Sequence, residues 1–400
     1  MFDILIKNAK LRNYKKLKDI GIKDGCIIKI SDKLTTKSRR IIDAQGNLVT
    51  ESFVNPHLHL CKVYTLMQMN EKALKDYHGE NMGKAMSAIE LAAKIKENYN
   101  EKWIIPNVRR AIKLAIENGV MHIRAFADVD SKAKLEGVKA LLKVKDEFKD
   151  EIHLEIVAFP QDGIVKEPEA YKLVEEAIKL GADIVGGIPW IELTEKDEKI
   201  HIDKMFEIAK KYNKQVSMLV DDAGDPGLRT LEMLAIKTIE ESWEGKVLAH
   251  HARAMSMYPT PYLIKLINLL KKAKIGLITD PHTGPLHARV KEMIEEKALI
   301  ALGQDDISDA YYPYGRNNML EVGFLASHIL WMTTEKEIKK LYDMITIDAA
   351  ECMGIQKFKL DVGNEANLVV LNVNNELEAF RNHEKPEYVI FKGKIINVLK

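Results

Sequence analysis

Two histidines separated by a single residue are the clearest chemical feature of the chain. His57 and His59 lie in the segment FVNPHLHL, directly after a short apolar run. In an extended segment residues i and i+2 project to the same side, so both imidazoles can reach one cation. A pair of solvated loop histidines is the alternative, but the position at the end of an apolar strand favours a metal site.

A carboxylate pair and a second histidine pair end two other apolar runs. Asp305 and Asp306 end one of them, and His250 and His251 end the other. A carboxylate can bind a metal and also accept a proton from water. Asp306 has a second interpretation as a helix N-cap. Strand alternation lets only one of the two adjacent histidines face a common site easily.

The apolar runs belong to a repeating pattern. Amphipathic helical stretches, such as Pro168–Leu180, separate most of them. The runs are Phe53–His57, Met121–Asp128, Ile152–Phe159, Asp183–Ile188, Gln215–Val220, Lys246–His250, Ile275–Thr279 and Leu299–Gly303. Eight apolar strands alternating with helices predict an α/β fold, a (β/α)8 TIM barrel. An open doubly wound sheet is the alternative, but no Gly-x-Gly-x-x-Gly follows the first strand.

Four of the candidate residues share one position in this pattern. His57, His59, His251 and Asp305 all fall at the carboxyl ends of predicted strands, where barrel enzymes place their active sites. His282, after the seventh strand, is a further candidate for the same end of the barrel. We expect the remaining histidines to be structural.

The sequence pattern at the two ends of the chain differs from the strand and helix alternation in the middle. Short β-like segments, an Asp-Gly turn at residues 24–25 and a turn at Gly393 predict paired strands. Because the termini of a domain often lie close together, we expect residues 1–50 and 357–400 to form one small β domain. Residues 51–356 then form the barrel.

The composition of the chain limits the classes of binding partner to expect. The 400 residues include 60 Lys+Arg and 59 Asp+Glu, a formal charge of +1. This balance favours a small-molecule substrate and gives no reason to expect nucleic acid or membrane binding. Three scattered cysteines without a CxxC motif argue against a disulfide framework and against a thiolate zinc site. We expect a cytoplasmic protein, with a homo-oligomer left open by the helices after the eighth strand.

Several motifs together resemble a known family. FVNPHLHL (Phe53–Leu60), IVAFPQDGI (Ile156–Ile164), GADIVGGIP (Gly181–Pro189) and GQDDISDAYYPYGRNNML (Gly303–Leu320) are similar to the cytosine deaminase and N-isopropylammelide amidohydrolase branch of the amidohydrolase superfamily. The similarity covers nearly the whole chain. It implies one divalent metal ion (Zn, Fe or Mn) bound by His57, His59 and Asp305. It also implies that His251 contacts the metal-bound water or the substrate.

The same resemblance implies a substrate and a reaction. Gln161 and Asp306 would bind a small nitrogen heterocycle that is cytosine-like or triazine-like, and Tyr311 would cover its ring. The expected activity is a metal-dependent hydrolytic deaminase, in which metal-activated water attacks the amine-bearing ring carbon. Asp305 would accept the proton of the water and Asp222 would deliver a proton to the substrate. The substrate itself cannot be named, and we expect the loop Thr65–Asn81 to set selectivity.

One position departs from the family pattern. Relatives place a metal-binding histidine on the fifth strand, where this chain has Leu219, which has no donor atom. Phe126 likewise stands where relatives have a histidine on the second strand. Three outcomes stay open. Asp221, two residues beyond Leu219, supplies a carboxylate; the metal keeps three protein ligands; or the metal is lost. The last gives the alternative function, a degenerate amidohydrolase paralogue that binds a heterocycle without deamination.

Overall fold

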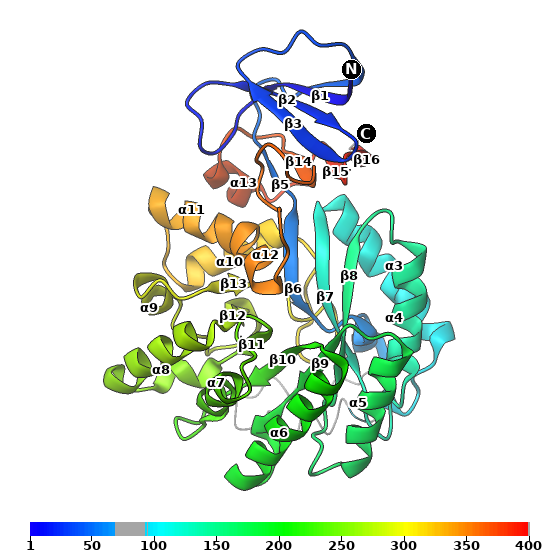
Figure 1. The fold of residues 1–400 in the computed structure, drawn as a ribbon, viewed down its shortest axis with the longest axis vertical. Coiled ribbons are helices and arrows are strands. Elements are labelled where there is room, and N and C mark those ends of the chain that lie inside the picture. Colours follow the sequence, from blue (N-terminus) through cyan, green and yellow to red (C-terminus); the bar gives the residue numbers. More distant parts are fainter. Residues whose placement is uncertain (69–92, 94, 399–400) are drawn as a thin grey trace.

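An eight-stranded parallel sheet forms the centre of the protein (Figure 1). The computed structural model describes residues 1–68, 93 and 95–398. The strands follow one another in sequence order and each pairs in parallel with the next. They are β6 (Phe53–Leu58), β7 (Val120–Asp128), β8 (His153–Phe159), β9 (Ile184–Gly187), β10 (Gln215–Val220), β11 (Val247–His251), β12 (Gly276–Thr279) and β13 (Ile300–Leu302). A parallel bridge between Leu58 and Asp305 joins the two edges, which confirms the predicted (β/α)8 barrel.

Helices alternate with these strands and cover the outside of the barrel (Figure 1). Their apolar faces pack on the strands in one continuous hydrophobic core. They are α3 (Glu101–Glu117), α4 (Glu136–Glu147), α5 (Pro168–Leu180), α6 (Glu195–Tyr212), α7 (Thr230–Glu240), α8 (Thr260–Ala273), α9 (Val290–Glu295), α10 (Met319–Ile329), α11 (Glu335–Met344) and α12 (Ile347–Met353). α6 begins at Glu195, where the Thr194 side chain caps the amide of Asp197.

The two chain ends lie together beyond one end of the barrel (Figure 1). One sheet has the order β3-β2-β1-β4, from β1 (Phe2–Ala9), β2 (Lys18–Lys23), β3 (Cys26–Ser31) and β4 (Ser38–Asp43). The other has the order β16-β15-β14-β5, from β5 (Val49–Glu51), β14 (Leu368–Val370), β15 (Tyr388–Phe391) and β16 (Lys394–Val398). Both sheets contribute to one hydrophobic cluster, so the predicted pairing of the termini is confirmed. The boundaries at residues 50 and 357 stay a prediction.

Three further features of the structure bear on the sequence-based expectations. The C-terminal segment contains a helix, α13 (Glu376–Asn382), that the strand-like pattern did not indicate; Asn375 caps it. Within the described part of the chain no helix is long and apolar enough to cross a bilayer. Residues 69–81 of the expected selectivity loop lie outside the described residues.

Candidate active site

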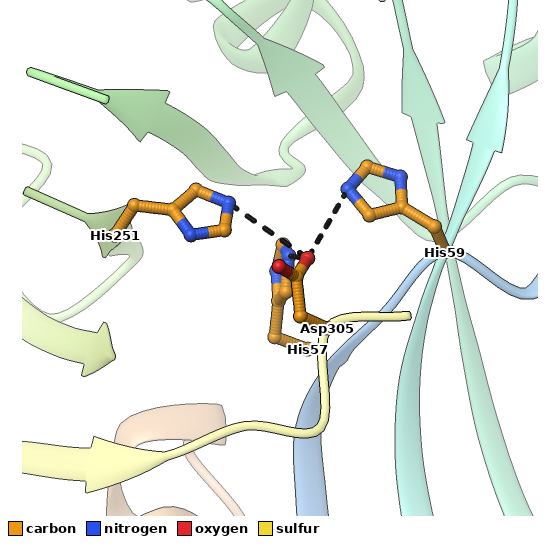
Figure 2. A group of neighbouring side chains, drawn as sticks. All are labelled: His57, His59, His251 and Asp305. Carbon is orange, nitrogen blue, oxygen red and sulfur yellow. Dashed lines mark hydrogen bonds and ion pairs between the residues drawn. The ribbon is translucent and has the colours of Figure 1, made fainter. Parts of the chain in front are cut away.

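Three imidazoles surround one carboxylate at the carboxyl end of the barrel strands (Figure 2). His57, His59, His251 and Asp305 each offer one ligand atom, and these atoms lie within 4.8 Å of one another. Asp305 Oδ1 lies 3.0 Å from His57 Nε2, 3.8 Å from His59 Nε2 and 4.0 Å from His251 Nε2. All four side chains are buried. The predicted His-x-His pair does face one point, with ring centroids 5.1 Å apart.

The backbone fixes Asp305 directly beside the two histidines of β6. The amide of His59 donates to the Asp305 carbonyl at 2.8 Å, and the amide of Asp305 donates to the His57 carbonyl at 2.9 Å. Asp305 itself has φ +68°, in the left-handed region that non-glycine residues seldom adopt. Such backbone conformations concentrate at functional sites, where surrounding structure holds them.

His250 and His251 both approach His57, which strand alternation did not predict. Their ring centroids lie 4.6 and 4.8 Å from that of His57. The reason is the left-handed turn at the end of β11, where His251 has φ +68° and Ala252 has φ +50°. His250 Nε2 bonds the Ser217 hydroxyl at 2.9 Å inside the barrel. His251 is the member of the pair that joins the cluster (Figure 2).

The carboxylates around His251 favour a positive charge on its ring. Burial by itself would lower the pKa of His251, but the carboxylates of Asp222, Asp280 and Asp305 outweigh burial and raise it to about 9. Burial also raises the pKa of Asp305 well above its usual range, and repulsion from Asp306 and Asp280 adds to this. Arg253 pairs with Asp222 and Asp280 at 2.7 Å, so these carboxylates are partly neutralised by a guanidinium.

Sequence reasoning missed Asp280 and Arg253. Asp280 Oδ1 accepts from His251 Nδ1 at 2.8 Å, and Asp280 Oδ2 accepts from Arg253 Nη2 at 2.7 Å. Arg253 Nε also donates to Asp222 Oδ1 at 2.7 Å. The position of Asp280, one residue after the seventh apolar run, was a usable signal. Arg253 lies in the short 3₁₀ helix Arg253–Met257, for which the sequence pattern gives no sign of proximity.

Asp221 does not take the position that strand alternation suggested. β10 ends at Val220 and Asp221 has φ +46°, so the two-residue period from Leu219 does not continue. Asp221 instead accepts hydrogen bonds from Thr230 Oγ1 at 2.7 Å and Tyr258 Oη at 2.6 Å. These hydrogen bonds hold the Asp221 carboxylate within the loop, so it does not lie in the cluster. Asp222 Oδ2 lies 3.9 Å from His251 Nε2, at the edge of the cluster.

The residues expected to bind substrate gather around a buried lysine that was not predicted. Lys62 Nζ donates to Gln161 Oε1 at 3.3 Å and lies 3.9 Å from Asp306 Oδ1. Its ammonium is 4.2 Å from the ring centroid of Tyr311. Lys62, Gln161 and Tyr311 line one pocket. The place of Lys62, three residues after His59, was the signal available in the sequence.

The wall of the barrel beside the cluster is apolar. Leu219 and Phe126 belong to one buried hydrophobic group with Phe159 and Trp190. The Phe126 ring lies 4.5 Å from the His57 ring. These residues offer no ligand atoms, so a cation here would depend on β6, β11 and the segment after β13.

Cys61 and His282 both lie near this end of the barrel. The buried Cys61 Sγ accepts a hydrogen bond from the Asp128 amide at 3.3 Å, and burial raises the pKa of this thiol. His282 Nε2 lies 3.3 Å from the Gln304 carbonyl, and burial lowers its pKa to about 4. Neither belongs to the four-residue cluster.

The donor set suits a transition-metal ion. Imidazole and carboxylate together are ligands of Zn, Fe and Mn, and the ligand atoms are close enough to share one ion. The Nδ1 atoms of His57 and His59 have no hydrogen-bond partner within the described residues, so their Nε2 atoms carry the polar contacts of both rings.

Comparison with known proteins places this chain in a family. The model of the amidohydrolase family matches residues 40–397. The chain belongs to this family, and it is a hydrolase that acts on carbon–nitrogen bonds other than peptide bonds.

Its relatives act on small heterocycles. The chain is 31% identical over 396 residues to N-isopropylammelide isopropyl amidohydrolase of Pseudomonas sp. (strain ADP), covering 99% of this chain and 97% of the relative. It is 30% identical to the solved 5-methylcytosine deaminase of Klebsiella pneumoniae liganded with 5-fluorocytosine, with a TM-score of 0.90 and coverage of 99% and 98%. N-isopropylammelide isopropylaminohydrolase of Burkholderia multivorans, at 22% identity, TM-score 0.87 and coverage of 99% and 98%, shares the fold.

Proposed function

We propose that this protein is a metal-dependent hydrolytic deaminase of a small nitrogen heterocycle, cytosine-like or triazine-like. The convergence of His57, His59, His251 and Asp305 at the carboxyl end of the barrel carries the proposal. The names of the relatives, a deaminase of 5-methylcytosine and an aminohydrolase of N-isopropylammelide, support the substrate class.

The metal would be held by His57, His59 and Asp305, with His251 facing the same point. A bound divalent ion supplies Lewis acidity that brings the pKa of water down to about 7. Asp305 is placed to accept the proton of the attacking water, because its Oδ1 lies at the centre of the cluster (Figure 2). Burial of the four side chains excludes bulk water, which strengthens each of these interactions.

Asp222 is the group best placed to give a proton to the leaving amine. Its Oδ2 faces His251, while its Oδ1 is held by Arg253. The heterocycle would lie next to Lys62, with Gln161 and Asp306 binding its polar edge and Tyr311 covering its ring. Ammonia or an alkylamine then leaves, and an oxo group replaces it on the ring carbon.

Metal analysis and a release assay test this proposal together. Protein produced with Zn, Fe and Mn should contain about one of these ions per chain and should lose activity on chelation. It should release ammonia or an amine from at least one member of a panel of pyrimidines, triazines and pterins. His57→Ala should lose both metal and activity, while His328→Gln, a change at an exposed surface histidine, serves as the control. Metal-loaded protein that releases no amine from the whole panel contradicts the deaminase assignment.

Leu219 favours a second candidate, a paralogue that binds a heterocycle without deaminating it. Such a paralogue would keep the pocket around Lys62 and would bind no metal ion. Binding of a panel heterocycle to metal-free wild-type protein, together with less than about 0.1 metal per chain, supports this second function and excludes the first.

A further inference from the structure

β10 contributes no ligand atom to the cluster, so the site has one imidazole fewer than the family pattern implies. Leu219, at the position of the missing imidazole, is buried against Phe126 and Phe159 in the apolar wall. Asp221 does not replace it, because its carboxylate is bonded to Thr230 and Tyr258. Another residue of this chain would have to supply the missing ligand atom.

His251 is oriented as a metal-binding histidine is. Its Nδ1 lies 2.8 Å from Asp280 Oδ1, which leaves Nε2 pointing at the cluster (Figure 2). Histidines that bind metal commonly donate the other ring nitrogen to a carboxylate, and this bond sets the tautomer and the ring orientation. Asp280 is itself held by Arg253 at 2.7 Å, so the imidazole has a rigid support.

The backbone of β11 is bent in a way that brings this ring into place. Both His251 and Ala252 have left-handed φ values, +68° and +50°. Because this conformation is unfavourable for non-glycine residues, the surrounding structure must enforce it. Its effect is that His251 approaches His57 to 4.8 Å between ring centroids, although His250 already approaches from the same strand.

The separations between the donor atoms fit one shared ion. Ligand atoms bound tetrahedrally at about 2.1 Å from zinc lie about 3.4 Å from one another. The Asp305 Oδ1 atom is 3.0, 3.8 and 4.0 Å from the Nε2 atoms of His57, His59 and His251. These values lie on both sides of the expected spacing, and all four donors meet within 4.8 Å.

We infer that His251 is a direct metal ligand in this protein and takes the place of the imidazole that β10 lacks. The inference rests on the proposed metal-dependent function and changes the role of one residue in it. Three imidazoles and one carboxylate then bind the ion, which restores the number and charge of the donors that the family pattern implies. Orientation of the water and proton delivery pass to Asp305 and Asp222, the latter held by Arg253.

Metal affinity separates this role from contact with water or substrate alone. Zinc dissociation constants would be measured by competition with a chromophoric chelator for wild type, His57→Gln, His251→Gln and His282→Gln. We expect His251→Gln to weaken zinc binding by about 100-fold or more, as His57→Gln does, because loss of a direct ligand exceeds the effect of a supporting residue. His282→Gln is the matched control, a partly buried histidine at the same end of the barrel outside the cluster, and should stay within about threefold of wild type.

A second variant tests ligation directly and guards against misfolding of the first. His251→Cys keeps a donor atom, and its cobalt-substituted form should show a sulfur-to-cobalt charge-transfer band that wild type lacks. Cobalt bound to His251→Cys without this band, or wild-type zinc affinity in folded His251→Gln, overturns the inference. Wild-type protein that binds no metal overturns the proposed function as well, so the two failures are distinguishable.

Discussion

Replacing Asp280 with asparagine tests whether its hydrogen bond to His251 orients this histidine in the proposed metal site. Asp280 is 4% exposed and accepts from His251 Nδ1 at 2.8 Å and from Arg253 Nη2 at 2.7 Å. Asparagine keeps the shape but removes the charge. Whichever way its amide faces, its NH2 group must meet one of these two donors.

This geometry sets the expected loss of folding stability and the expected loss of metal affinity in Asp280→Asn. Breaking a buried ion pair typically costs about 3 to 5 kcal/mol. Arg253 keeps a second carboxylate partner in Asp222 at 2.7 Å, so we expect a loss near the lower end, about 3 kcal/mol in the free energy of unfolding. Loss of the carboxylate behind a metal-binding histidine weakens metal affinity by about 10- to 100-fold, or about 1.4 to 2.7 kcal/mol.

Urea unfolding of the metal-free protein measures the first quantity, and chelator competition measures the second. Asp19→Asn is the matched control, because Asp19 is a buried carboxylate of the terminal sheets that accepts from the amides of Asn8 and Leu34. It should lower stability without changing zinc affinity. Unchanged zinc affinity in Asp280→Asn would refute the role of Asp280 in orienting His251.

Two further predictions concern residues that hold the loops and strands of the site. Burial would raise the pKa of Glu192, but His201 and backbone amides lower it, and burial lowers the pKa of His201. Both folded-state pKa values lie below the ordinary ones, so the stability from His201 is lost as pH falls below about 6.5, and the stability from Glu192 is lost as pH falls below about 4.3. Glu192→Gln should flatten the loss of stability below about pH 4.3 in urea titrations, and a curve parallel to wild type in that range would contradict it. A Cβ on Gly303 would lie 2.8 Å from His57 Cβ, so Gly303→Ala should cost about 1 to 3 kcal/mol and reduce metal content on analysis; unchanged content would refute the tight fit.

The sequence determined the architecture because its signals are local and repeated. Eight Val- and Ile-rich runs separated by amphipathic helices predict a barrel, since each strand must be covered on its outer face. The i, i+2 spacing of His57 and His59 and the place of Asp305 at the end of a strand likewise depend only on strand geometry. The sheet order confirms the barrel, and the structure brings His57, His59 and Asp305 together in one cluster.

Only the tertiary structure decided which side chains support the site. The left-handed φ values of Asp221 and His251 end the alternation on which the sequence argument relied. Asp221 therefore turns to Tyr258, while His251 turns into the cluster. Arg253 and Lys62 reach Asp280 and Gln161 through contacts between residues 27 and 99 positions apart. No local pattern encodes such contacts, because they form only when separate strands lie side by side in the sheet.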